Sequence, residues 1–273
     1  MDRYQSLIKK GRDFVCGWDK TDEFPSDQVK KLPQPPLVKK KMSENQIALP
    51  MNFKDLSMNN DFLSLLYNRC SRRIYTNETM SLLELSYLLW ATQGVKSIRG
   101  NNYATLRTVP SGGARHAYET YLAIRNVEGL KDGAYHYLPM SNEIEFIKEI
   151  DDYQNSVARS LMGQTWAAKG NVVFYWAMVG YRCEWRYGVN AHRPALIDVG
   201  HIGQNLYMAC ESVGLGICAI AAFDHEYCAP MFNLDLDEEF VVYTCPVGKV
   251  KEEDKAREND IYAFVKDEKG AQE

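Results

Sequence analysis

The sequence predicts an α+β fold in which a central sheet is flanked by helices around one core. Two segments read as helices: Ser81–Ala91, with leucines at helical spacing, and His201–Val213, with an apolar face that repeats in the same way. Between them, Asn171–Val179 is apolar at almost every position, which is typical of a central strand covered on both faces. Further short β-rich segments separate the helices along the 273 residues.

Composition excludes several classes of protein. The formal net charge is −4 and the isoelectric point is near 5.8, so there is no basic footprint for nucleic acid or an anionic membrane. The seven cysteines form no CxxC pair, which argues against a disulfide framework and a zinc site, and we predict no metal. The N-terminus lacks the apolar core of a signal peptide, and the longest apolar run, Val172–Val179, is too short to span a bilayer. We therefore expect a cytoplasmic protein.

Residues 1–58 are predicted to form an irregular N-terminal arm. The prolines of Pro33–Pro36 fix φ and remove N–H donors, and no hydrophobic period is sustained. A few early apolar side chains could dock the arm on the main body: Leu7, Ile8, Phe14 and Trp18.

Two helices follow the arm. The first is expected over Asp61–Asn68, with Phe62, Leu65 and Leu66 on one face. The second begins with a capping box formed by Ser81 and Glu84, and it ends near Gly94.

The middle of the chain reads mainly as strands. Arg99–Asn102 is expected to be a loop, and the turn signal at Asp132-Gly133 predicts a hairpin. The expected elements are strands at Thr120–Arg125, Ala134–Leu138 and Glu143–Ile147, and a helix at Asn155–Met162.

The last part of the chain begins where Gly214-Leu215-Gly216 ends the long helix. Strands are expected at Ile217–Phe223 and Phe240–Val247. Residues 251–273 form a charged extension, in which Ile261–Val265 is an apolar island that could pair with a partner subunit.

Two segments carry candidate ligand-binding chemistry. Ser111–Ala114 have little side-chain volume, so their backbone could approach an anionic or ring-shaped cofactor, with the forked donors of Arg115 next to it. Arg69, Ser71 and Arg73, with Arg72 between them, combine guanidinium and hydroxyl donors that suit a phosphate. A simple turn and a solvated basic helix end are the alternative interpretations of these two segments.

Taken together, five blocks resemble the nitroreductase-like flavoprotein superfamily. They are Arg69–Tyr75, Ser81–Val95, Arg107–Arg125, Tyr187–Phe223 and Cys245–Lys249. More narrowly, the chain resembles the SagB-type dehydrogenase branch, which includes oxidases that convert peptide azolines into thiazoles and oxazoles. The resemblance implies a three-layer fold over residues 59–250, with a mainly antiparallel sheet, and an FMN site at the interface of a homodimer.

The resemblance also implies which residues bind FMN. These are Arg69, Ser71, Arg73, Pro110, Ser111, Gly112, Gly113, Arg115, Gln204, Leu215, Gly216 and Lys249. Cys70 stands where relatives usually have a second arginine.

A catalytic pair is implied at Arg186-Tyr187, where azoline-oxidising relatives have Lys-Tyr. Arginine effectively never loses its proton, so Arg186 cannot serve as a base, although it could hold an anionic substrate or polarise a carbonyl. Tyr187 matches the relatives, and a packed aromatic side chain is the alternative for it.

The expected activity is an FMN-dependent NAD(P)H:acceptor reductase with ping-pong hydride transfer through flavin N5 to a small-molecule acceptor. No Rossmann G-x-G-x-x-G is present, so NADH or NADPH is expected to bind only transiently. The alternatives are a peptide azoline dehydrogenase and a flavin-binding protein without turnover.

Overall fold

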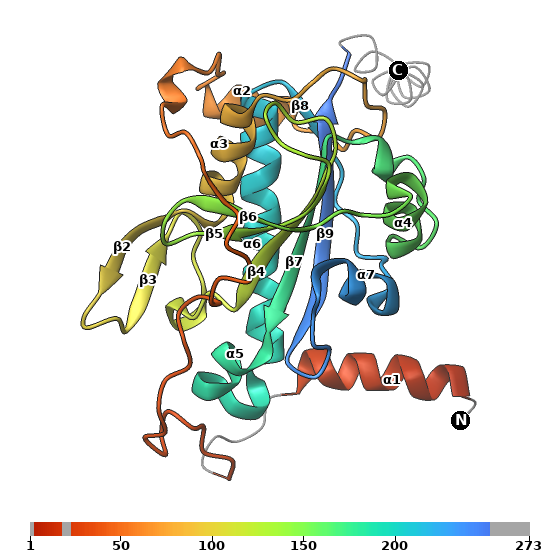
Figure 1. Ribbon diagram of the computed structural model, residues 1–273. Helices are drawn as coiled ribbons and strands as arrows, with labels where there is room; N and C mark the ends of the chain where they lie inside the picture. The colour runs from red at the N-terminus through yellow and green to blue at the C-terminus, as the bar shows by residue number, and fades with distance from the viewer. Residues whose placement is uncertain (1–2, 18–22, 252–273) are drawn as a thin grey trace, which may run out of the picture.

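A seven-stranded antiparallel sheet forms the centre of the molecule, seen in a computed structural model that describes residues 3–17 and 23–251 (Figure 1). Its strand order is β1-β6-β5-β4-β7-β9-β8. The strands are β1 Gln46–Ala48, β4 Tyr118–Ile124, β5 Gly133–Leu138, β6 Glu143–Lys148, β7 Val172–Val179, β8 Leu215–Ile217 and β9 Glu239–Lys249. Neighbouring strands are paired in the antiparallel sense in each of these ladders.

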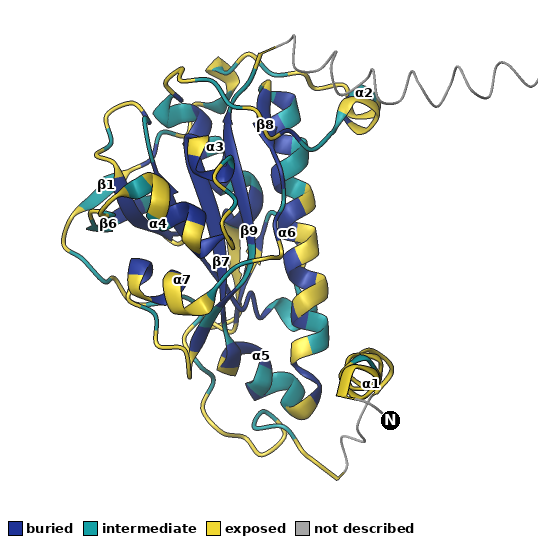
Figure 2. Ribbon diagram, turned by 90° about the vertical axis from the view of Figure 1, so that its right-hand side faces the viewer, coloured by how far each residue is buried: buried dark blue, intermediate teal, exposed yellow. Residues whose placement is uncertain are grey.

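Helices cover both faces of this sheet. α3 (Leu82–Gln93) and α6 (His192–Ser212) lie on one face, and α4 (Tyr153–Ser160) and α7 (His225–Phe232) lie on the other (Figure 2). Successive side chains of a strand point to opposite faces. In β7, Phe174 and Trp176 accordingly join the core with α3 and α6, whereas Val173 and Tyr175 join the core with α4 and α7. The predicted α+β fold with three layers and a mainly antiparallel sheet is confirmed.

The three segments on which the fold prediction rested are present. β7 lies between β4 and β9, and its residues are buried from Val172 to Met178. α3 has the predicted capping box, in which the Ser81 hydroxyl accepts from the Glu84 N–H at 3.1 Å and the Glu84 carboxylate accepts from the Ser81 N–H at 2.8 Å. α6 begins nine residues earlier than predicted, because Pro194 falls in its first turn, where a missing N–H costs no hydrogen bond.

The loop expected at Arg99–Asn102 is confirmed as a turn, closed by residues with positive φ at Gly100 and Asn102. It joins an unpredicted hairpin of β2 (Val95–Arg99) and β3 (Ala104–Arg107). Two further elements differ from the prediction. The strand expected at Ile217–Phe223 stops at Ile217. The chain then forms α7, whose first turn is capped by Asp224. An unpredicted helix, α5 (Gly180–Tyr187), follows β7 directly.

The N-terminal arm is more regular than expected. It contains α1 (Arg3–Cys16), and β1 adds an edge strand to the sheet, so the prediction of irregular chain is wrong for both segments. The predicted docking of Leu7 and Phe14 is also wrong, because these side chains are 57% and 47% exposed. Trp18 and the island Ile261–Val265 lie outside the described residues.

The short helix α2 (Phe62–Asn68) confirms the predicted position but only part of the predicted face. Leu65 is buried, whereas Phe62 and Leu66 are exposed. Among the described residues, no helix has both the length and the apolar character needed to cross a bilayer.

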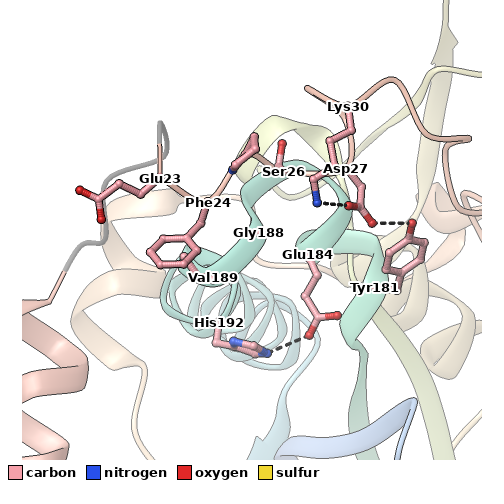
Figure 3. A pocket seen from close by; sticks show the side chains of 11 residues that line it. Glu23, Phe24, Ser26, Asp27, Lys30, Tyr181, Glu184, Gly188, Val189 and His192 are labelled. Carbon is pink, nitrogen blue, oxygen red and sulfur yellow. Dashed lines mark hydrogen bonds and ion pairs between the residues drawn. The ribbon is translucent and has the colours of Figure 1, made fainter.

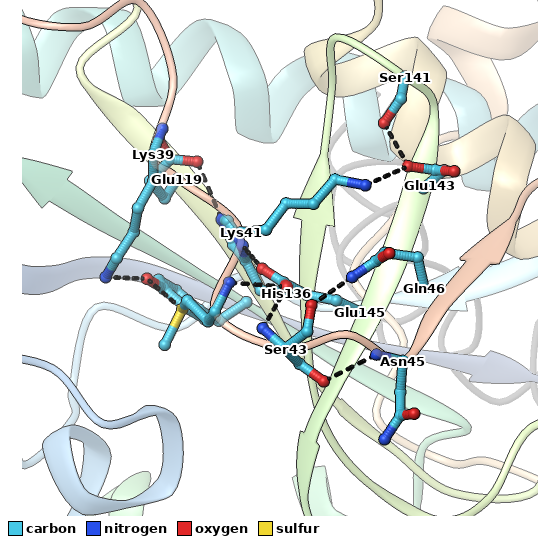
Figure 4. A network of polar contacts seen from close by, with 12 residues as sticks. Lys39, Lys41, Ser43, Asn45, Gln46, Glu119, His136, Ser141, Glu143 and Glu145 are labelled. Carbon is cyan, nitrogen blue, oxygen red and sulfur yellow. Dashed lines mark hydrogen bonds and ion pairs between the residues drawn. The ribbon is translucent and has the colours of Figure 1, made fainter.

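A buried polar network holds the arm on the sheet (Figure 4). Fully buried His136 lies between two carboxylates, with Nε2 3.0 Å from Glu119 Oε2 and Nδ1 2.7 Å from Glu145 Oε1. The Lys39 N–H donates to Glu119 at 2.8 Å, and the Met42 N–H donates to Glu145 at 2.8 Å. Hydrogen bonds from the backbone of the arm to buried carboxylates therefore hold the arm against the sheet.

Candidate functional site

The first group of predicted ligand-binding residues is the basic segment, residues 69–73, which follows α2. The Arg72 N–H donates to Ile217 O of β8 at 2.7 Å, which fixes the segment beside the sheet edge. The Ser71 hydroxyl lies 2.8 Å from the Tyr207 hydroxyl of α6, and the Arg69 guanidinium lies 5.3 Å above the Tyr207 ring. Tyr207 is a contact that the sequence did not suggest.

The arginines of the basic segment fall into two kinds. Arg72 is 4% exposed and pairs with Glu211 at 3.7 Å, so it belongs to the packing of the fold. Arg69 and Arg73 form no ion pair with any of the described residues, and Arg73 lies 5.7 Å above the Trp166 ring. Two guanidinium groups without a carboxylate, which flank Ser71 in the sequence, fit an anionic group such as a phosphate.

The edge formed by β8 and β9 supports the basic segment. In this ladder Leu215 pairs with Lys249 and Gly216 pairs with Gly248. A Cβ on Gly216 would lie 3.2 Å from the Arg72 Cβ, so glycine lets the basic segment pack closely. The Lys249 ammonium is 2.7 Å from Glu84 Oε1 at the start of α3, and this lysine is therefore already paired.

The second group is the glycine loop, residues 110–115. Asp198 of α6 holds it, because its carboxylate accepts from the Ser111 hydroxyl at 2.7 Å and from the Gly112 N–H at 3.0 Å. Burial raises the pKa of Asp198, although these hydrogen bonds oppose the change. Asp198 is not among the predicted site residues, and its only signal in the sequence is a single carboxylate in the apolar run 195–200.

The backbone of the glycine loop is largely satisfied within the chain. The N–H groups of Gly112, Ala114, Arg115 and His116 donate to Asp198, to Ser111 or to Gly112. These four N–H groups are thus engaged within the chain itself. Pro110, at the start of the loop, is exposed.

The glycines instead make room for the predicted catalytic pair. A Cβ on Gly113 would lie 2.9 Å from Arg186 Cζ, and a Cβ on Gly112 would lie 3.3 Å from the Tyr187 hydroxyl. Both side chains come from the end of α5 and are half-buried. The structure therefore brings the glycine loop together with Arg186 and Tyr187.

Arg115 lies beneath this pair and is 3% exposed. Its Nε donates to Gly113 O at 3.0 Å and its Nη2 donates to Tyr103 O at 2.9 Å. Its guanidinium is 4.9 Å from the Tyr103 ring centre and 5.4 Å from that of Trp185. Arg115 thus shapes the loop from inside.

α6 connects the two groups. Asp198, in the glycine loop group, and Tyr207, in the basic segment group, are nine residues apart on this helix, which places them roughly 13 Å apart along its axis. Between them Gln204 is exposed, whereas Asn205 donates to Ala91 O at 2.9 Å and ties α6 to α3. His201 is exposed on the same helix.

A cavity of about 620 Å³ lies beside α5 (Figure 3), but the predicted site residues do not line it. Several of its polar groups are paired with one another. His192 Nε2 is 3.0 Å from Glu184 Oε1, and the Tyr181 hydroxyl donates to Asp27 at 3.0 Å.

The profile of the nitroreductase family matches residues 66–249, which include both groups and most of the sheet. The chain belongs to the nitroreductase family. An archaeal relative, the candidate nitroreductase MJ1384 of Methanocaldococcus jannaschii, is 31% identical over 185 residues, which are 68% of this chain and 89% of the relative. The predicted family is confirmed, and the chain is an oxidoreductase of this family.

Two further relatives support the SagB-type branch of the nitroreductases. The microcin B17-processing protein McbC of Escherichia coli is 29% identical over 135 residues, 47% of this chain and 49% of McbC. The trifolitoxin-processing protein TfxB of Rhizobium leguminosarum is 28% identical over 141 residues, 49% of this chain and 38% of TfxB. The chain thus matches half or less of these two processing proteins.

Solved structures agree on the nitroreductase fold. A candidate nitroreductase from Ralstonia eutropha superposes with a TM-score of 0.62 at 24% identity, over 81% of this chain and 95% of the other. A chain of the E. coli McbBCD microcin synthetase complex superposes with a TM-score of 0.56 at 18% identity, over 92% of this chain and 95% of the other.

Proposed function

We propose that this nitroreductase is an FMN-dependent enzyme that takes electrons from NADH or NADPH and reduces a small-molecule acceptor. The observation that carries the proposal is the pair Arg69 and Arg73, two guanidinium groups without an ion pair to the rest of the described chain, on either side of Ser71. These three residues would hold the FMN phosphate. The glycine loop, Gln204, Leu215 and Gly216 would border the ring, and Lys249 would add positive charge while paired to Glu84.

When bound, FMN supplies the two-electron chemistry, and the protein supplies binding, orientation and access. Without a separate nicotinamide-binding motif, donor and acceptor would use the same space in turn, which predicts ping-pong kinetics. Arg186 would orient the acceptor. The Tyr187 hydroxyl would hold a proton beside it, in the part of the site bordered by Gly112.

We also propose that the enzyme is a homodimer. Large apolar side chains are exposed on α2 and on the outer face of α6, on the same side of the molecule (Figure 2). They are Phe62, Leu63, Leu66, Tyr67, Leu196 and Ile197. Exposed large apolar side chains gathered on one side of a molecule are typical of an interface. Sedimentation equilibrium is expected to give twice the chain mass of 31.3 kDa, and a monomer at micromolar concentration would contradict this.

A second candidate is a peptide azoline dehydrogenase, favoured by the similarity to McbC and by Tyr187. Arg186 speaks against it, because arginine cannot take a proton from the substrate. A flavin-binding protein without turnover is the third candidate. No disulfide links the seven cysteines, all of which lie among the described residues. This suits a reducing compartment, and we propose the cytoplasm.

An anaerobic absorbance spectrum tests the proposal. The purified protein, after reconstitution with FMN, is expected to show a flavin band at ~450 nm that bleaches when NADPH or NADH is added. A nitroaromatic or quinone acceptor should then restore the band. A bound flavin that does not bleach would favour the azoline dehydrogenase or the binding protein, and a protein that does not take up FMN would refute the central proposal.

A further inference from the structure

Two arginine side chains meet at one glycine in the glycine loop. Arg115 Nε donates to Gly113 O at 3.0 Å, and the Arg186 side chain covers the face of Gly113 where a Cβ would lie. Tyr103 joins them, because its carbonyl accepts from Arg115 at 2.9 Å and its hydroxyl accepts from Arg186 Nη1 at 2.9 Å. The two positive charges are therefore held close together.

Neither charge is neutralised by a carboxylate from residues 3–17 or 23–251. This differs from two other buried arginines, Arg72 and Arg182, which pair with Glu211 and Glu119. Asp198, in the same loop group, is occupied by Ser111 and Gly112.

The groups that hold the two arginines are neutral. Arg186 donates to the Tyr103 hydroxyl and to Gln28 Oε1, the latter at 3.3 Å, and Arg115 donates to backbone carbonyls. Neutral acceptors fix the orientation of a guanidinium without cancelling its charge, so the site is positive before any ligand arrives. Arg115 is buried, whereas Arg186 remains half-exposed and can reach a ligand.

We infer that the acceptor reduced by this enzyme carries a carboxylate or a similar anionic oxygen group, and that Arg186 binds it. The inference rests on the proposed function and names its substrate class. The planar fork of a guanidinium matches two carboxylate oxygens, and the charge of Arg115 behind it strengthens the attraction. The basic segment is the better candidate for the cofactor phosphate. Arg69 lies against Tyr207 in the C-terminal half of α6 and Arg73 lies against Trp166, whereas Asp198, which holds the glycine loop, is in the N-terminal half of α6.

The test compares two acceptors with the same reducible group, 4-nitrobenzoate and 4-nitrobenzyl alcohol, on the FMN-loaded protein. Wild type is expected to prefer the anion, and the preference should shrink as salt is added. Arg186→Gln should raise KM for 4-nitrobenzoate about tenfold or more and should lower kcat/KM for the anion more than for the alcohol, so that the ratio of the two kcat/KM values falls about tenfold. The KM of Arg186→Lys for 4-nitrobenzoate should lie between those of wild type and Arg186→Gln, because lysine keeps the charge but lacks the planar fork.

A binding measurement without turnover accompanies the kinetics. The Kd of benzoate, measured by calorimetry, should rise about tenfold in Arg186→Gln and stay unchanged in Arg159→Gln, a control on α4. Equal losses for both acceptors, or an unchanged benzoate Kd, would overturn the inference and leave the reductase proposal intact. The inference would also be overturned, with the reductase proposal intact, if wild type reduced 4-nitrobenzyl alcohol but not 4-nitrobenzoate. Absence of flavin bleaching and of turnover with either acceptor would refute both.

Discussion

Replacing Arg73 by alanine is expected to weaken FMN binding by roughly 10- to 150-fold. The physical reason is the loss of a charge-assisted contact to the phosphate, worth about 1.5–3 kcal/mol, at about 1.4 kcal/mol per tenfold change in Kd. Arg73 is exposed and has no ion pair to the other described residues, so its removal should cost the fold little. Titration of the apoprotein with FMN, followed by quenching of flavin fluorescence, measures the effect.

The matched control is Arg99→Ala, which removes an exposed arginine from the end of β2. Its FMN affinity should equal that of wild type at the same ionic strength. Because the lost contact is electrostatic, the gap between Arg73→Ala and wild type should narrow as salt is added. If Arg73→Ala bound FMN as tightly as wild type, the phosphate site would lie elsewhere.

The framework of the fold could be predicted because its signals are local. The capping box at Ser81 and Glu84 marks a helix start within four residues, and the run Val172–Val179 suits only a strand covered on both faces. The strand predicted after Gly216 failed for a non-local reason. Beyond Ile217 the chain makes only an isolated bridge at Ile220 before Asp224 starts α7, so apolar composition alone could not set the end of the strand.

The candidate site could be predicted only in part, for a similar reason. The residues in contiguous motifs, such as 69–73 and 110–115, were found from the sequence. Their partners come from distant positions: Gln28 and Tyr103 hold Arg186, and Asp198 holds the glycine loop. A single residue 83 to 158 positions away from its partner leaves no local pattern. The small volume of Gly112 and Gly113 was the right property to predict a close approach. The groups that approach them in the structure are side chains of α5, however, and the prediction was a cofactor.

The second large effect is expected at Glu119, in the buried network beneath the arm. Glu119→Gln should lower the free energy of unfolding by about 3–5 kcal/mol, because it removes one charge from a buried set and leaves the others uncompensated. Glu119 is 2% exposed and binds both Arg182 and His136. Urea denaturation at neutral pH measures the change.

The matched control is Glu143→Gln on β6, the next strand but one. Its carboxylate pairs with Lys41 at 3.5 Å, and both side chains are partly exposed. Exposed pairs contribute about 0–1 kcal/mol, so the control should change stability little. Comparable losses in the two variants would mean that burial does not set the strength of these pairs.

The same network predicts how stability depends on pH. Burial alone would lower the pKa of His136, but the hydrogen bonds to Glu119 and Glu145 outweigh it and raise the pKa above its usual 6.5. Its contribution is therefore complete below about pH 6.5 and is lost as the pH rises through the folded-state pKa. Burial would raise the pKa of Glu119, yet Arg182 and His136 hold it well below 4.5. Its contribution is therefore complete above about pH 4.5 and is lost progressively as the pH falls from there to the lowered pKa.

These opposite signs give a testable window. The stability difference between wild type and His136→Gln should be largest between about pH 4.5 and 6.5. It should then decline at higher pH by at most about 1.4 kcal/mol per pH unit, the limit for one proton. Urea titrations at several pH values measure the difference. If the stability difference instead grew above pH 6.5, His136 would be neutral in the folded protein. One of its ring nitrogens would then face a carboxylate without donating a proton to it.

The pH should also affect the arm. His136 contacts Glu119 and Glu145, which accept hydrogen bonds from the Lys39 and Met42 N–H groups. When His136 loses its proton, the arm should loosen before the rest of the fold. Hydrogen exchange at these two N–H groups should therefore accelerate in the same pH range.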